Sequence, residues 1–123
     1  SLYQGLESLL NISSKLPINQ NRSNFIIVGS RSHMSNATQK YFDQKNNEFN
    51  NVEILAVGSS LKICMVAEGK ADAYPRYAPT MEWDTAAGHA IANCAGKSLI
   101  DVNTKKAMVY NREQLRNNWF IVS

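Results

Sequence analysis

The stretch Phe25-Ile26-Ile27-Val28-Gly29-Ser30 decides the fold class of this chain. Four consecutive apolar residues that stop at a Gly-Ser pair are typical of a short strand buried on both faces. A second apolar run, Val52 to Val57, stops in the same way at Gly58-Ser59-Ser60. The first run is followed by a stretch of helical periodicity that Ser32 or Ser35 can cap. The sequence therefore predicts strands that alternate with helices and pair in parallel.

The rest of the chain continues this alternation. A helix that begins at Leu61 is expected to end at Gly69, a suitable C-cap residue. Residues 71–77 are predicted to form a strand, in which Pro75 indicates an edge or a bulge. Further elements are predicted at 84–96 (helix), 98–102 and 119–122 (strands), with a short strand expected at 108–110. Together they predict an α/β domain with a mixed, largely parallel sheet flanked by helices.

The predicted helix at 84–96 should turn one apolar side to the core. That side consists of Ala87, Ala90, Ile91, Cys94 and Ala95. The two cysteines, Cys64 and Cys94, are interpreted as reduced, buried thiols. No zinc-ligand spacing links them to His33 or His89, and His89 is interpreted as structural.

Length and composition limit the class of protein. The 123 residues suffice for one ordinary domain, and 44% apolar with 19% charged residues excludes a disordered chain. The net charge is only +3 and the basic residues are scattered, so no nucleic-acid partner is expected. No apolar run approaches the ~18 residues of a membrane helix, and no signal peptide is recognised. A cytoplasmic location is expected, with peripheral attachment to the inner face of the membrane left open.

Residues 1–24 form a poorly defined lead-in. The leucines of this segment fit a helical period, but Gly5 weakens that prediction and Pro17 ends whatever precedes it. The following polar stretch, residues 19–24, is expected to be a loop.

Three polar clusters stand where ligands gather in α/β proteins, beyond the carboxyl ends of strands and at helix starts. The first is Gly29-Ser30-Arg31-Ser32-His33, and the second is Gly58-Ser59-Ser60-Leu61-Lys62. Lys62 is notable, because a cation in the first turn of a helix opposes the helix dipole unless an anion lies beside it. The third cluster contains Asp84, which the dipole at a helix start keeps ionised and which suits Mg²⁺. The alternative interpretation is that Lys62 is a solvated surface lysine and that the serines and Asp84 only cap helices.

The segment Trp83-Asp84-Thr85-Ala86-Ala87-Gly88 resembles the tryptophan–aspartate–x–alanine–alanine–glycine signature of the inositol monophosphatase superfamily. Three further segments resemble one branch, the bacterial CysQ-type 3′(2′),5′-bisphosphate nucleotidases. They are Ser30-Arg31-Ser32-His33, Gly58-Ser59-Ser60-Leu61-Lys62 and Val66 to Arg76. The motifs occur in the family's order, and the resemblance covers residues 25–123.

The resemblance implies a Mg²⁺-dependent phosphatase in which Asp84 is a metal ligand. The implied substrate is adenosine 3′,5′-bisphosphate, hydrolysed at its 3′-phosphate to AMP and phosphate, with 3′-phosphoadenylyl sulfate as a further substrate. In the family, Arg31 and His33 occupy the loop that faces the nucleotide. The residues implied to contact the substrate are Arg31, His33, Ser59, Lys62, Arg76 and Asp84.

The family's first signature, aspartate–proline–isoleucine–aspartate–glycine–threonine, and its upstream metal-binding glutamate do not occur in the sequence. The resemblance therefore implies that residues 1–123 are the C-terminal, substrate-binding and metal-contributing domain of a two-domain enzyme with the layered αβαβα sugar-phosphatase fold. The implied partner is the missing N-terminal domain, without which the chain is expected to be inactive. Homo-oligomerisation is left open. The rival readings are another inositol monophosphatase-like sugar phosphatase and a non-catalytic module that binds a nucleotide or another anion.

Overall fold

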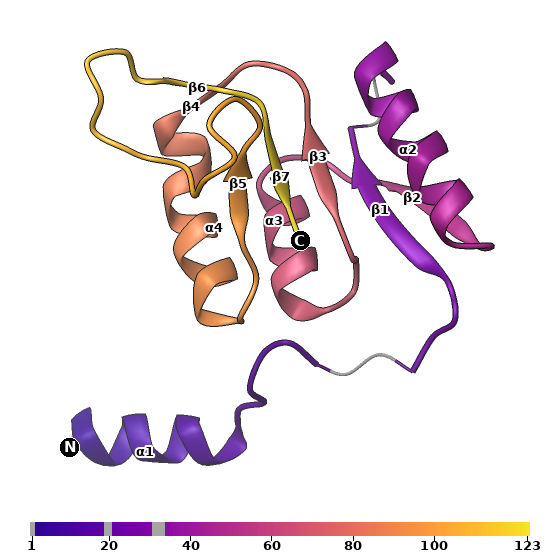
Figure 1. Ribbon diagram of the computed structural model, residues 1–123. Helices are drawn as coiled ribbons and strands as arrows, with labels where there is room; N and C mark the ends of the chain where they lie inside the picture. Colours follow the sequence, from indigo (N-terminus) through magenta and orange to yellow (C-terminus); the bar gives the residue numbers. More distant parts are fainter. Residues whose placement is uncertain (1, 19–20, 31–33) are drawn as a thin grey trace.

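The computed structural model describes residues 2–18, 21–30 and 34–123 (Figure 1). The predicted strand pair forms β1 (Phe25–Gly29) and β2 (Val52–Ala56), which run parallel. Their register places Phe25 beside Val52 and Gly29 beside Ala56, so both strands end at the same edge of the sheet. The two Gly-Ser turns therefore leave the sheet side by side, as the matching apolar runs predict.

The helix between these strands is α2 (Asn36–Glu48). Of the two serines proposed as its cap, Ser35 fills the role, because its hydroxyl accepts a hydrogen bond from the backbone N–H of Thr38 at 3.2 Å. Ser32 lies outside the described residues. The Phe25 and Phe49 rings stack with centroids 4.5 Å apart, which fixes the end of α2 against the start of β1.

Helix α3 (Leu61–Glu68) ends at Gly69, as predicted. Gly69 adopts φ +85°, a conformation that favours glycine. Space also demands a glycine there, since a Cβ atom would stand 2.6 Å from the backbone oxygen of Ile18. Gly69 therefore both ends α3 and contacts the lead-in segment at Ile18.

The remaining strands of the main layer are β3 (Tyr74–Arg76), β5 (Leu99–Asp101) and β7 (Phe120–Val122). They pair in the order β3-β7-β5, and both pairs are antiparallel. A parallel bridge between Ile27 and Ala73 joins this sheet to β1. The expected mixed sheet flanked by helices is confirmed, but the expectation that it is largely parallel is wrong, because in the described chain only β1 and β2 form a parallel ladder. The reason is connectivity, because β7 returns to the sheet through a long loop rather than through a crossover helix.

Pro75 lies in β3, opposite Ile121 of β7. Hydrogen-bonding direction alternates along a strand, and Ala73 bonds to β1 through both its N–H and its carbonyl. The Pro75 nitrogen therefore faces the β1 side, where pairing has already ended after the single bridge. The proline costs no ladder hydrogen bond there, which explains its tolerance inside the sheet.

A small sheet that the sequence does not reveal pairs β4 (Thr80–Met81) with β6 (Arg116–Asn117). The strand expected at 108–110 is absent from the described chain, where the nearest pairing is a bridge between Ile100 and Ala107. Two-residue strands carry no periodicity, so their position depends on tertiary contacts.

Helix α4 (Glu82–Cys94) begins two residues before the predicted start. Its predicted apolar side is wrong for four of five residues. The buried positions are Thr85, Gly88, His89 and Ala92, together with Ala95 just beyond the helix. Ala87, Ala90, Ile91 and Cys94 are exposed. Both cysteines are free, as expected, but Cys94 is not buried and Cys64 only partly so.

The choice of buried side follows from helix packing. Helices α3 and α4 lie against each other (Figure 1). A Cβ atom at Gly88 would stand 3.0 Å from the Ile63 side chain, so the missing side chain of Gly88 permits this close approach. The close approach of α3 at Gly88 determines which side of α4 is buried, and the number of apolar residues on a side does not.

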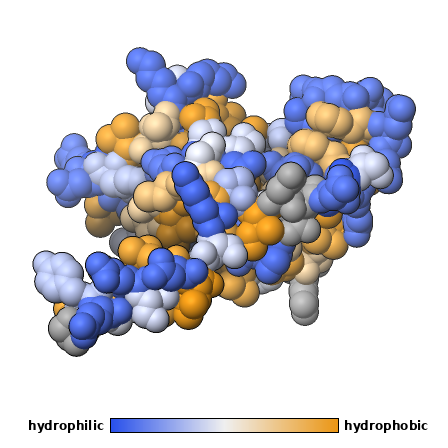
Figure 2. Space-filling view, turned by 90° about the horizontal axis from the view of Figure 1, so that it is seen from below, coloured by the Kyte–Doolittle hydropathy of each residue, from blue (hydrophilic) through white to orange (hydrophobic). Residues whose placement is uncertain are grey.

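The lead-in contains α1 (Leu2–Ile12), which lies apart from the sheet in Figure 1. None of its residues is buried. The view from below in Figure 2 shows hydrophobic surface beside hydrophilic residues on the face where α1 lies. No described helix combines the length and apolar character needed to cross a membrane.

Candidate active site

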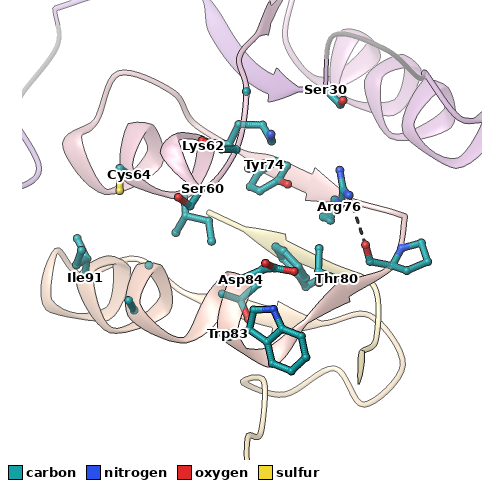
Figure 3. A pocket seen from close by; sticks show the side chains of 18 residues that line it. Ser30, Ser60, Lys62, Cys64, Tyr74, Arg76, Thr80, Trp83, Asp84 and Ile91 are labelled. Atoms are coloured by element: carbon teal, nitrogen blue, oxygen red, sulfur yellow. Dashed lines mark hydrogen bonds between the residues drawn. The ribbon is translucent and has the colours of Figure 1, made fainter. Parts of the chain in front are cut away.

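A pocket of about 600 Å³ lies between the starts of α3 and α4, at the end of the sheet where β1 and β3 finish. Figure 3 shows Lys62 and Arg76 on one side of it and Asp84 with Trp83 on the other. Its polar lining comes from segments distant in the sequence. The polar side chains discussed below are Ser59, Ser60, Lys62, Arg76, Thr80 and Asp84.

Lys62 belongs to the first turn of α3, yet it is only 4% exposed. Its ammonium donates to the backbone oxygen of Val57 at 3.2 Å and lies 5.3 Å from the centroid of the Tyr74 ring. Burial lowers the pKa of Lys62, and the positive charge of Arg76 lowers it further. The interpretation of Lys62 as a solvated surface lysine is therefore wrong.

Arg76, at the end of β3, is the second cation of the pocket. One of its terminal nitrogens donates to the backbone oxygen of Pro79 at 3.4 Å (Figure 3). Burial raises the pKa of the neighbouring Tyr74 hydroxyl, whereas the charge of Arg76 and a hydrogen bond from it act in the opposite direction. Two cations that repel each other inside one pocket favour an anionic ligand between them.

Asp84 faces these cations from the start of α4 (Figure 3). It is the third residue of the helix, and its Oδ2 accepts a hydrogen bond from the Met81 backbone N–H at 2.9 Å. This contact closes the first helical turn as a capping box does. Asp84 is exposed and lines the pocket, and its other carboxylate oxygen, Oδ1, takes no part in this hydrogen bond.

The start of α3 forms the back of the pocket. Ser59 adopts a left-handed backbone conformation with φ +55°, unusual for a residue with a side chain. Ser60 is the N-cap residue of α3, and its side chain makes no capping hydrogen bond. Ser59 and Ser60 both line the pocket, while the backbone N–H groups of Lys62, Ile63 and Cys64 donate to the backbone oxygens of these two serines.

The structure brings together four of the six residues proposed to contact the substrate. Ser59, Lys62, Arg76 and Asp84 line one pocket although they span 26 positions of the sequence. The other two, Arg31 and His33, lie outside the described residues. Ser30, which immediately precedes them, lines the same pocket.

The donor set tests whether a metal ion fits. Asp84 offers one exposed carboxylate, suitable as a single ligand for a hard cation such as Mg²⁺. Among the described residues, no group of three or more histidine, cysteine, aspartate or glutamate side chains could hold a metal. Nearby Glu82 is already occupied, because its carboxylate accepts hydrogen bonds from the backbone of Asn111 and Arg112. The described residues thus fit one ligand of a metal site and do not fit a complete one.

Sequence reasoning missed three contributors to the pocket and its support. Tyr74 supplies the ring beside Lys62, and Trp83 forms an exposed rim. Asn117 supports the Asp84 turn from behind and lies far along the chain. Tyr74 and Trp83 belong to motifs already quoted, so their roles could have been found, whereas Asn117 carries no local signal.

Comparisons with known protein families and curated proteins identify relatives of this chain. Residues 2–120 match the model of the inositol monophosphatase family. The chain is 43% identical over 98 residues to the 3′(2′),5′-bisphosphate nucleotidase CysQ of Escherichia coli K12. This match covers 80% of the chain and 38% of that relative, so the chain spans about two fifths of the relative's length.

Solved structures give the same result for the fold. The crystal structure of CysQ from Bacteroides thetaiotaomicron superposes with a TM-score of 0.88 at 49% identity, covering 96% of this chain and 44% of that one. A structure of a Staphylococcus aureus inositol monophosphatase bound to 2′-AMP matches with a TM-score of 0.64 at 19% identity, covering 92% of this chain and 42% of the other. The second likeness bears on the fold alone.

Proposed function

Because the chain belongs to the inositol monophosphatase family, we propose that it is the substrate-binding, metal-contributing part of a phosphatase acting on a bisphosphorylated nucleotide. The proposed reaction removes the 3′-phosphate of adenosine 3′,5′-bisphosphate and releases AMP and phosphate, with 3′-phosphoadenylyl sulfate as a second substrate. The observation that carries the proposal is the pocket in which Lys62 and Arg76 face Asp84.

The two cations provide the anion-binding side of the proposed site. Lys62 is fixed by the Val57 backbone oxygen and by the Tyr74 ring, so it is held in place before a ligand arrives. A pre-positioned charge loses little entropy on binding a phosphate. Arg76 and the Ser59 hydroxyl are proposed to complete the contacts to the phosphate that is not cleaved, while Arg31 and His33 are proposed to face the nucleotide.

Asp84 is proposed as one ligand of Mg²⁺, whose chemistry when bound is charge neutralisation at the phosphoryl group and activation of water. The remaining ligands are proposed to come from an amino-terminal domain that lies outside this chain. Catalysis of phosphoryl transfer depends mostly on positioning and charge stabilisation. The role of this chain is accordingly to hold the nucleotide so that its 3′-phosphate reaches Asp84.

Phosphate release from adenosine 3′,5′-bisphosphate by the complete gene product tests the proposal. We expect Mg²⁺-dependent turnover that Asp84→Asn abolishes, and no turnover by residues 1–123 alone. Inositol monophosphate hydrolysed in preference to the nucleotide would identify another sugar phosphatase of the family. Nucleotide binding without turnover by the complete protein would identify a binding module, and both outcomes contradict the proposal.

A further inference from the structure

The orientation of Asp84 is not explained by the pocket itself. The side chain is exposed, and its one hydrogen bond among the described residues comes from the backbone of Met81, three residues earlier. That bond fixes the carboxylate only if the turn from Met81 to Thr85 is itself fixed. Something behind the helix must therefore hold both ends of the turn.

Asn117 provides this support. It is 5% exposed, and its side-chain nitrogen lies 3.0 Å from the backbone oxygen of Met81 and 2.9 Å from the hydroxyl of Thr85. The same nitrogen lies 3.1 Å from the hydroxyl of Thr80. One buried amide thus joins the residue before α4 to the residue after Asp84, from a strand more than thirty positions away in the sequence.

The position of Asn117 is fixed in turn from two sides. Asn117 lies in β6 opposite Thr80 of β4, so the pairing of these two strands fixes its position relative to the Met81–Thr85 turn. The loop that precedes β6 is tied to α4 by Glu82, whose Oε2 accepts the Asn111 N–H at 2.9 Å. Thr85 is also buried and donates to the Glu82 backbone oxygen at 3.3 Å. The hydrogen bond between Asn117 and Thr85 is therefore buried from solvent.

We propose that Asn117 is a positioning residue for the metal ligand Asp84, which it controls by clamping the two ends of the Met81–Thr85 turn. This proposal rests on the proposed function, because it assumes that Asp84 binds a metal ion. Groups that orient a metal ligand without touching the metal typically change metal affinity about 10–100-fold when removed. Asn117 does not line the pocket, so its removal should affect metal binding and leave nucleotide binding intact.

The test replaces Asn117 by leucine, which keeps the volume and removes the donor. Asn118→Leu is the matched control, because that neighbouring amide donates to Asp101 at 2.9 Å and makes no hydrogen bond to α4 among the described residues. Mn²⁺ is the probe, and the free ion is measured by electron paramagnetic resonance on the complete gene product without substrate. We expect the Mn²⁺ dissociation constant to rise about tenfold or more in Asn117→Leu. It should change less than about twofold in Asn118→Leu, as should the KM for the nucleotide at saturating Mg²⁺ in both variants.

An unchanged Mn²⁺ dissociation constant in folded Asn117→Leu, or an equal rise in Asn118→Leu, overturns the proposal. If Asn117→Leu does not fold, Thr85→Val removes one end of the clamp and is judged by the Mn²⁺ dissociation constant alone, because Thr85 itself lines the pocket. If the wild-type protein binds no Mn²⁺, the proposed function fails, and amide hydrogen exchange at Met81 decides the clamp separately. Exchange about tenfold faster in Asn117→Leu than in Asn118→Leu supports the clamp, and equal exchange refutes it.

Discussion

The ammonium of Lys62 lies 5.3 Å from the centroid of the Tyr74 ring, inside a pocket that also contains Arg76. The chain keeps this lysine buried although burial and Arg76 both lower its pKa, which means that both disfavour its charged form. Such an arrangement costs folding stability at every pH at which the lysine is charged in the folded chain, because burial and Arg76 disfavour that form. A cost of this kind is characteristic of a residue kept for binding.

Lys62→Met should therefore stabilise the chain. Methionine keeps the unbranched stem and removes the charge, so Tm should rise by a few degrees at pH 7. Because the pKa of Lys62 is lower in the folded state than the 10.5 of the unfolded chain, the wild-type free energy of unfolding should gain a contribution as pH rises toward 10.5. The variant should lack that contribution. Calorimetry between pH 7 and pH 10.5 checks both points, with exposed Lys70→Met as the control.

The same substitution should weaken nucleotide binding in the complete gene product. A charge-assisted hydrogen bond contributes about 1.5–3 kcal/mol, or roughly tenfold to 150-fold in affinity. The loss of kcat/KM should be larger for adenosine 3′,5′-bisphosphate than for a substrate with one phosphate, because Lys62 is proposed to hold the phosphate that is not cleaved. Equal losses on both substrates would show that Lys62 does not read that second phosphate.

Ser59 and Ser60 offer a matched pair for testing backbone strain in the turn before α3. Ser59 has φ +55°, whereas Ser60 has φ −62°, which any residue adopts readily. Ser59→Val should lose about 1–3 kcal/mol of stability, because a β-branched side chain is disfavoured at positive φ. Ser60→Val should lose much less, and Ser59→Gly should retain the wild-type stability. Urea unfolding of the three variants measures the difference, and similar losses for both valine variants would contradict the assigned strain.

The sequence predicted those parts of the fold whose signal is local. The apolar runs of β1 and β2 stop at glycine, Ser35 caps α2 and Gly69 ends α3, and each of these features depends on a few adjacent residues. Positions that depend on distant neighbours were not predictable. The rotation of α4 follows from Gly88 packing on Ile63, and the β4–β6 pair is too short to show a pattern.

The same division applies to the candidate site. Its pocket residues belong to contiguous motifs that resemble a known family, so Ser59, Lys62, Arg76 and Asp84 could be named in advance. Asn117, which supports the Asp84 turn, could not be named in advance. Asn117 acts through geometry that exists only after β6 has paired with β4. A polar residue in an irregular segment gives no sign of such a role.

We predict that the buried side chain of His89 makes the chain less stable in mild acid. It is 6% exposed, its Nδ1 lies 2.8 Å from the Tyr110 hydroxyl oxygen, and burial lowers its pKa below the usual 6.5. The unfolded chain therefore takes up the proton first, and the free energy of unfolding falls as pH drops from about 6.5 through the lower folded-state pKa. In His89→Phe the stability should depend less on pH between 7 and 5, as measured by urea unfolding.

Tyr110→Phe is the control for this experiment. It removes the phenol that partners His89 but leaves the histidine buried. We expect a loss of about 0.5–1.5 kcal/mol at pH 7, with the acid-dependent fall retained. A His89→Phe variant as sensitive to acid as the wild type would assign the fall to other groups.

The final prediction concerns the exposed apolar face of α1. Leu2, Leu6, Leu9 and Leu10 are all more than half exposed, and no residue of the helix is buried. Apolar surface of this extent on a helix usually finds a partner, so residues 1–123 in isolation should self-associate. Replacing Leu6, Leu9 and Leu10 together by glutamine should restore a monomer, because it removes the stripe while keeping good helix formers. Light scattering over a concentration series measures the effect, with Lys40→Gln and Asn47→Gln on the exposed side of α2 as the control. A wild-type chain that stays monomeric at roughly millimolar concentration would show that this face needs no partner.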